Sequence, residues 1–184
     1  LSAASGLDVT MPYTVAGSAT GSGTDHDLAD GSLTIAAGST GDSISLTVTE
    51  DVLDEDDEIV VVSMTTGSLT NASAGATTSH ALTITDNDAT PSDNFSAAAQ
   101  PVAESVGGVA ATVDLEAVSG RDVTVPYTVS GSATGSGTDH DLADGTLVIL
   151  AGLASGTITF NATADTMDEP DETVVVSITV GSLV

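Results

Sequence analysis

The chain contains the same sequence twice, and this duplication constrains its fold more than any other feature. Residues 6–69 align with residues 120–183 at a constant offset of 114 positions (Asp51 to Asp165), without an insertion. The segment 17–31 is identical to the segment 131–145. A repeat of this length is long enough to enclose a core of its own. We therefore expect two similar domains in tandem.

Apolar residues recur at every second position within each copy, which is the period of a β-strand and not of a helix. Turns rich in Gly and Asp separate these runs. Short strands at regular spacing over about 100 residues predict antiparallel β-sandwiches and an all-β protein. The runs cover residues 9–15, 44–48 and 60–64 in the first copy and residues 123–129, 158–162 and 174–178 in the second.

The alignment of the two copies predicts the domain limits. Leu1 aligns with Leu115, so nothing in the first copy matches residues 95–114, and nothing in the second matches residues 70–93. We expect a first sandwich over 1–88 that lacks its first strand, a linker over 89–94, and a second sandwich over 95–184 that lacks its last strand. The absent strands would come from further repeats of a longer array. The alternative is that identical chains in a fibre supply them by strand complementation.

Composition excludes several classes of partner. The formal net charge is −26, with a single basic residue among Lys and Arg, and a surface this negative repels nucleic acid and anionic lipid. No apolar run approaches the roughly 20 residues of a membrane span, so we expect no direct membrane insertion. Cysteine is absent, which excludes disulfides and thiolate metal sites.

Acidic residues crowd into one turn of each copy, residues 51–58 and 165–172, directly before a Val-rich strand. Each like-charge contact at about 4 Å costs roughly 4 kcal/mol at an effective dielectric constant near 20, so either a cation offsets it or the turn stays splayed in water. Calcium takes about six to eight oxygen ligands, and the spacing is not that of an EF-hand. The candidate calcium ligands are Asp25, Asp51, Glu55, Glu58, Asp86 and Asp88 in the first copy, and Glu104, Asp139, Asp165, Glu169 and Glu172 in the second.

The combination of motifs resembles the Calx-β domain, which occurs in sodium/calcium exchangers, integrin β4 and large bacterial surface proteins. The motifs are Val102-Ala-Glu104, Val-x-Val-Pro-Tyr at 123–127, the Gly-rich segment 131–139, the acidic turn 165–172 and the closing segment 82–88. The resemblance implies immunoglobulin-like sandwiches with Ca²⁺ at the interdomain end. It also implies ligand roles for Glu104, Asp139, Asp165, Glu169, Glu172 and the pair Asp86/Asp88.

One departure from the family pattern affects the expected number of ions. Calcium-regulated members carry two adjacent acids before the turn, where this chain has Glu50-Asp51 in the first copy and Ala164-Asp165 in the second. We therefore expect fewer or weaker ions in the second copy. The family's aromatic residue after the first loop Asp is His26 or His140 here, and we expect both histidines to fill a structural slot.

These features predict an extracellular structural repeat of a bacterial surface adhesin or fibre, in which calcium at interdomain acidic loops stiffens the array. The expected partners are neighbouring repeats of the same chain or identical chains. The alternatives are a regulatory calcium-sensing module and a filament subunit assembled by strand complementation. No catalytic arrangement recurs, so we expect no enzyme. Three sequons are candidate glycosylation sites, with glycans as further partners: Asn71, Asn94 and Asn161.

Overall fold

The structure is a computed structural model and describes residues 1–179; residues 180–184, the end of the predicted second domain, lie outside this range. Over that range the chain is all-β with antiparallel sheets, as predicted, and its helical segments are two single 3₁₀ turns. None of the helices among the described residues has the length and apolar character needed to cross a membrane. The chain divides into unit 1, formed by 1–52 and 56–87, and unit 2, formed by 53–55 and 88–184.

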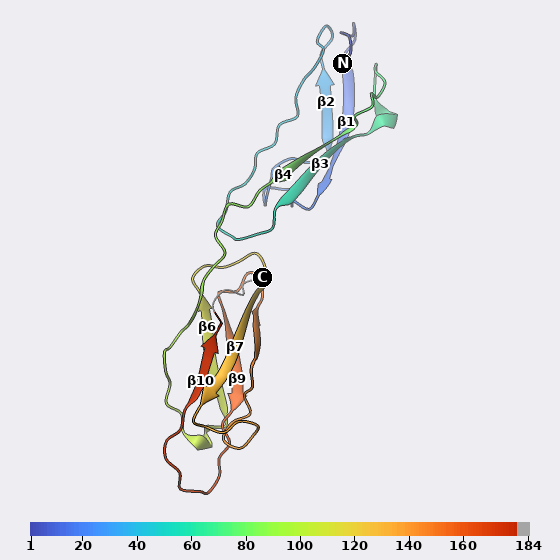
Figure 1. The fold of residues 1–184 in the computed structure, drawn as a ribbon. Helices are drawn as coiled ribbons and strands as arrows, with labels where there is room; N and C mark the ends of the chain where they lie inside the picture. The colour runs from blue at the N-terminus through green and yellow to red at the C-terminus, as the bar shows by residue number, and fades with distance from the viewer. Residues whose placement is uncertain (180–184) are drawn as a thin grey trace. The chain divides into compact units, whose positions relative to one another are not determined.

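Unit 1 contains one four-stranded antiparallel sheet in the order β2-β1-β3-β4, which Figure 1 labels. The alternating run predicted at 9–15 lies in β1, and the run at 60–64 lies in β3, as the period of two requires. Buried apolar residues on this sheet are Val9, Ile35 and Val60. The elements are β1 (Val9–Gly17), β2 (Gly31–Ile35), β3 (Glu58–Met64), the 3₁₀ turn η1 (Thr66–Ser68) and β4 (Ser79–Ile84).

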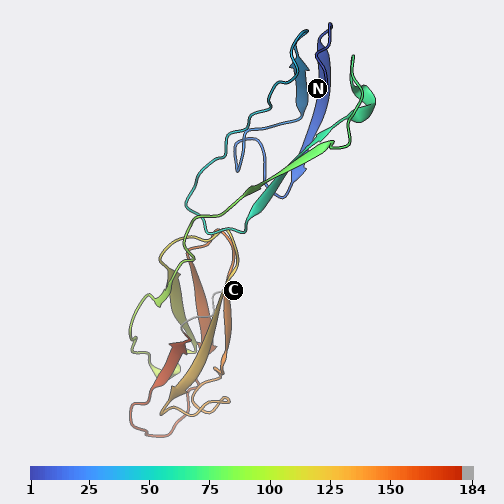
Figure 2. The ribbon, with the colours of Figure 1, turned by 45° about the horizontal axis from the view of Figure 1, so that its top comes forward.

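Unit 2 contains two three-stranded antiparallel sheets, in the orders β10-β7-β8 and β5-β6-β9, and its strands can be followed in Figure 2. Its elements are β5 (Asp93–Phe95), the 3₁₀ turn η2 (Glu104–Val106), β6 (Gly108–Leu115), β7 (Val123–Gly131), β8 (Gly145–Ile149), β9 (Ser155–Asn161) and β10 (Val174–Ile178). Strand β5 begins within the segment that the sequence predicts as the linker.

The core of unit 2 lies between its two sheets, which is the arrangement of an immunoglobulin-like sandwich. One sheet contributes Val113 and Leu115 from β6 and Ile158 from β9, and the other contributes residues of β7 and β8. Fully burying an aliphatic side chain contributes about 1.5–3 kcal/mol. Aliphatic residues form this core because the chain has few aromatic residues. The buried cluster is Val113, Leu115, Val123, Val125, Leu142, Ile149 and Ile158.

One predicted strand does not form. Residues 44–48 have the alternating pattern of a strand, but residues 41–47 form none, and only the isolated bridge from Val48 to His26 remains. The equivalent strand of unit 2, β9, pairs along its whole length with β6. Unit 1 contains no strand equivalent to β6, so the backbone of 41–47 has no ladder partner. Residues 44–48 do have the alternating apolar pattern of a strand, but a strand also needs a neighbouring strand for its backbone hydrogen bonds.

Candidate metal-binding loops

Three predicted ligands come together in unit 2. Asp139 lies in the loop between β7 and β8, and Glu169 and Glu172 lie in the loop between β9 and β10. Desolvation, a hydrogen bond with Asp139 and the negative charges of Asp139 and Glu169 raise the pKa of Glu172 above its usual 4.5. The direction of this shift is the one expected for carboxylates that lie near one another.

The position of Asp139 is fixed by a turn that both copies build in the same way. Its Oδ2 accepts a hydrogen bond from the Thr134 backbone N–H at 2.5 Å, which closes the Gly-rich loop. In the first copy, Asp25 accepts the same bond from the Thr20 N–H. One carboxylate oxygen of each residue is thus used within the loop, and the other remains for a further partner.

The neighbouring histidines fill structural slots, as predicted. His140 and His26 are only 4% and 2% exposed. The Nδ1 atom of His140 accepts a hydrogen bond from the Leu142 N–H at 3.2 Å, and that of His26 accepts one from the Leu28 N–H at 3.1 Å. Each ring therefore carries its proton on Nε2. His140 also meets Phe160 edge to face, with 6.3 Å between ring centroids.

The other two predicted ligands of the second copy also meet. Glu104, in η2, accepts a hydrogen bond from the Asp165 backbone N–H through Oε1 at 2.7 Å. The Oδ1 atom of Asp165 accepts the Met167 N–H at 2.6 Å, so the carboxylate begins the turn that carries Glu169 and Glu172.

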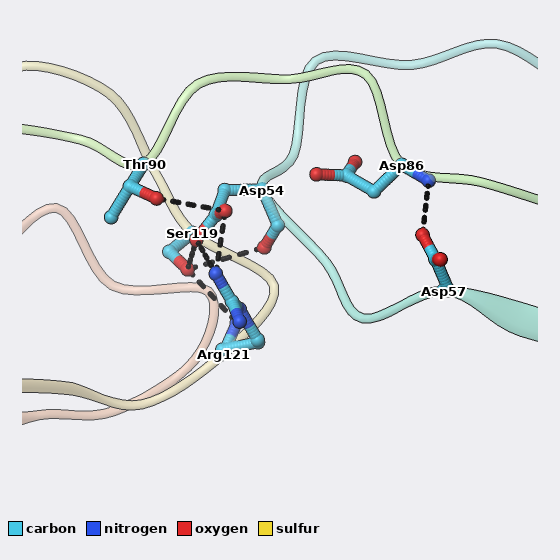
Figure 3. A network of polar contacts seen from close by, with 6 residues as sticks. All are labelled: Asp54, Asp57, Asp86, Thr90, Ser119 and Arg121. Carbon is cyan, nitrogen blue, oxygen red and sulfur yellow. Dashed lines mark hydrogen bonds and ion pairs between the residues drawn. The ribbon is translucent and has the colours of Figure 1, made fainter. Parts of the chain in front are cut away.

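The six candidates of the first copy are divided between the two units. Asp25, Asp51, Glu58 and Asp86 belong to unit 1, whereas Glu55 and Asp88 belong to unit 2. The backbone N–H of Asp86 donates to Oδ1 of Asp57 at 3.0 Å (Figure 3). Nowhere in residues 1–179 do three or more His, Cys, Asp or Glu side chains already have the arrangement needed to hold a metal ion. Calcium binding would therefore require side-chain rotations in these loops.

Many other carboxylates of the chain cap turns, and the duplication repeats them. Asp27 accepts the Thr47 N–H at 2.7 Å, and its equivalent Asp141 accepts the Asn161 N–H at 2.7 Å. These bonds from Thr47 and Asn161 lower the pKa of Asp27 and Asp141 below 3.8. Further equivalent pairs that accept backbone N–H groups are Asp8 and Asp122, and Asp30 and Asp144. These acidic residues thus stabilise turns, a role that does not depend on a metal ion.

One buried carboxylate was not predicted from the sequence: Asp54 is 5% exposed and belongs to unit 2. The Nη2 atom of Arg121 lies 2.6 and 2.7 Å from its Oδ1 and Oδ2 (Figure 3). Ser119 donates to Oδ2 at 3.2 Å, and Thr90 donates to Oδ1 at 3.3 Å. The hydrogen bond from Arg121 is the largest cause that lowers the pKa of Asp54 below 3.8, against the opposing effect of desolvation. The only sequence signal was that Arg121 is the sole Lys or Arg in the chain.

The three candidate glycosylation sites differ in their surroundings. The Nδ2 atom of Asn71 donates to the Asp8 carbonyl at 2.8 Å, and that of Asn161 donates to Asp141 Oδ2 at 2.7 Å. Asn94 is exposed and lies in β5.

Comparison with known proteins finds a matching family model and several similar solved structures. The family model of the Calx-beta domain matches residues 3–88 and again residues 86–183. Solved structures that resemble the chain include CBD12 from CALX1.2, with 18% identity, 94% of this chain and 68% of that chain covered, and a TM-score of 0.43. The calcium binding domain CBD12 of CALX1.1 has 21% identity, covers 93% and 68%, and has a TM-score of 0.40. A search of curated proteins finds no match.

Proposed function

The chain belongs to the Calx-beta domain family, and from this membership we propose that it is a calcium-binding structural repeat of a surface adhesin or fibre. The observation that supports calcium in this particular chain is the meeting of Asp139, Glu169 and Glu172 from two separate loops of unit 2. Oxygen ligands drawn from separate loops are what a Ca²⁺ site in a sandwich requires. We assign the chain a binding and structural role, not a catalytic one.

The proposed site of unit 2 uses Glu104, Asp139, Asp165, Glu169 and Glu172. Glu104 and Asp165 are already joined by a hydrogen bond, so the two groups of carboxylates need only approach each other around one ion. The same positions in the first copy are Asp25, Asp51, Glu55 and Glu58, with Asp86 and Asp88 from the closing segment. Calcium would offset the repulsion that a net charge of −26 imposes on such loops.

Stiffening of the array follows from the energy of binding. An extracellular module with a Kd near 10⁻⁴ M in millimolar calcium has about ten times more free ion than its Kd, and gains about 1.4 kcal/mol per site. This energy is small for a whole domain, but it is enough to bias the position of a loop. We propose that such loops restrict bending between successive repeats outside the cell.

A calcium titration tests the proposal directly. We expect the Tm of the whole chain to rise in millimolar calcium and to fall again on addition of EGTA, as differential scanning calorimetry would measure. Glu169→Gln should abolish most of the rise, because it removes a negatively charged ligand. The control is Asp114→Asn on β6, an exposed carboxylate that has no part in the loops. A Tm that does not respond to calcium in the unaltered chain would refute the proposed calcium site.

A regulatory calcium sensor is the alternative within the same family. It requires a response at micromolar calcium and therefore a site rich in ligand charge. The second copy has Ala164 where its first copy has Glu50, which favours a weaker site. Isothermal titration calorimetry separates the two roles, since a micromolar Kd favours the sensor and a submillimolar or weaker Kd favours the structural repeat.

Strand complementation between chains is the second alternative, and one observation favours it. Residues 41–47 have the sequence of a strand but no ladder partner in unit 1. A partner chain in a filament would have to offer a strand like β6, with its alternating apolar residues. A synthetic peptide with the sequence of residues 108–116 tests this, because complementation predicts that it binds the chain and raises its Tm.

A further inference from the structure

The single guanidinium group of the chain contacts a carboxylate inside the most acidic turn of the first copy. Residues 51–58 contain six acidic side chains in the sequence Asp-Val-Leu-Asp-Glu-Asp-Asp-Glu, and Arg121 forms an ion pair with Asp54. Asp54 is buried, while the Arg121 side chain is 39% exposed. A buried carboxylate without a partner is strongly disfavoured, so this contact requires the guanidinium.

Backbone geometry brings the same two segments together. Asp54 forms a parallel β-bridge with Ser119, and the Gly120 N–H donates to the Asp54 carbonyl at 3.1 Å. A Cβ atom at Gly120 would lie only 2.7 Å from Cγ of Glu55, so glycine allows the two segments to approach. The Arg121 N–H donates to Ser119 Oγ at 3.0 Å, which orients the hydroxyl toward the carboxylate. Residues 53–55 are thus joined to unit 2 by an isolated β-bridge and a backbone hydrogen bond.

The first copy offers a comparison within the same chain. Ser5, Gly6 and Leu7 occupy the positions equivalent to Ser119, Gly120 and Arg121, and Leu7 is 62% exposed. Asp168 is equivalent to Asp54 and is exposed. The serine and the glycine are therefore repeated in both copies, and the guanidinium is the part that only the second copy has.

We infer that Asp54, Thr90, Ser119 and Arg121 form a metal-independent latch, in which Arg121 acts as a positioning residue that holds residues 53–55 as part of unit 2. The latch supplies a protein cation to the buried carboxylate of the acidic turn. Arginine suits this role because it stays charged and is less strongly hydrated than lysine. The inference stands apart from the proposed calcium site, since no atom of the latch requires an ion.

Amide hydrogen exchange of the full chain in EGTA tests the latch through the exchange rate of the Gly120 N–H. We expect the Gly120 N–H to be protected without calcium, and Asp54→Asn to raise its exchange rate by at least about tenfold, which corresponds to about 1.4 kcal/mol. Arg121→Met should have the same effect. Asp168→Asn, the matched control in the second copy, should leave Gly120 unchanged. The ladder between β6 and β9 should stay protected in all variants.

Two results would overturn the inference. One is a Gly120 amide that exchanges equally fast in the unaltered chain and in Asp54→Asn. The other is protection that appears only after calcium is added. If Asp54→Asn unfolds all of unit 2, Arg121→Lys decides the question, because it keeps a cation at the same position. Slower Gly120 exchange in Arg121→Lys than in Arg121→Met supports the latch, and equal exchange in the two variants contradicts it.

Discussion

Asp139 and Glu172 lie in different loops of unit 2, and desolvation together with the neighbouring Asp139 raises the pKa of Glu172 above its usual 4.5. Desolvation and the neighbouring acid both disfavour the ionised form of Glu172, and this explains the direction of its raised pKa. The contact therefore has opposite consequences with and without a cation. Without one, it opposes folding at neutral pH, and in the proposed calcium site the same two groups are ligands.

The first prediction tests whether the Glu172 charge destabilises the chain without calcium and stabilises it with calcium. In EGTA, Glu172→Gln should raise the Tm of the chain, because it removes a crowded negative charge and retains a hydrogen-bonding group. In millimolar calcium, the same variant should bind the ion about tenfold more weakly or worse and should lose the advantage. Calorimetry of the variant under both conditions provides the measurement. An equal change of Tm with and without calcium would show that Glu172 does not contact the ion.

The second prediction concerns pH. The pKa of Glu172 in the folded chain lies above 4.5, so its unfavourable contribution is present at neutral pH and disappears as the pH falls toward 4.5. The pKa values of Asp27, Asp54 and Asp141 lie below 3.8, so their stabilising bonds persist at pH 3.8 and are lost at lower pH. The metal-free chain should therefore gain stability as the pH falls from 7 toward 4.5, and lose it below 3.8.

Urea denaturation at a series of pH values measures this profile, and the Glu172→Gln variant serves as the control. The gain between pH 7 and 4.5 should be smaller in the variant, whereas the loss below 3.8 should be the same in both proteins. Identical profiles over the whole range would contradict the assignment of the upper transition to Glu172. Calcium affinity should fall over the same upper range, because protons compete with the ion.

The sequence predicted the repeated elements well, because alternation of side chains determines which face of a strand is buried. β1, β3, β7 and β10 all lie at the predicted runs. The strand expected at 44–48 is absent, since hydrogen-bond partners come from distant residues and leave no local signal. Asp139, Glu169 and Glu172 were predicted to meet from their repeated positions. The pairing of Asp54 with Arg121 was not predicted, because the fold of the backbone determines which acidic side chain Arg121 contacts.

The third prediction concerns the buried histidines. His140→Ala removes a side chain that packs against Gly135 and Phe160 and leaves the N–H of buried Leu142 without its acceptor. Loss of the packing and of the bond should destabilise unit 2 by about 2–4 kcal/mol. His140→Asn should cost less, because the amide oxygen can replace Nδ1 as the acceptor. Denaturation of both variants provides the test, and equal losses would show that the hydrogen bond is unimportant.

The fourth prediction concerns Gly131, at the end of β7. Its φ is +134°, and a Cβ atom there would lie 2.0 Å from the Thr173 carbonyl oxygen, at the start of the pairing between β7 and β10. Gly131→Ala must therefore move the two strands apart, and we expect a loss of about 3 kcal/mol or more. Gly152 has φ of +80° and open space around it, so Gly152→Ala should cost only about 1 kcal/mol. Both glycines have positive φ, but only Gly131 also meets the neighbouring strand, so a larger loss at Gly131 than at Gly152 is the result expected from the close approach of β10 to β7. Equal losses would mean that β10 can shift without a cost in stability. The loop that carries Glu169 and Glu172 would then not be held in place by β10, as the proposed calcium site requires.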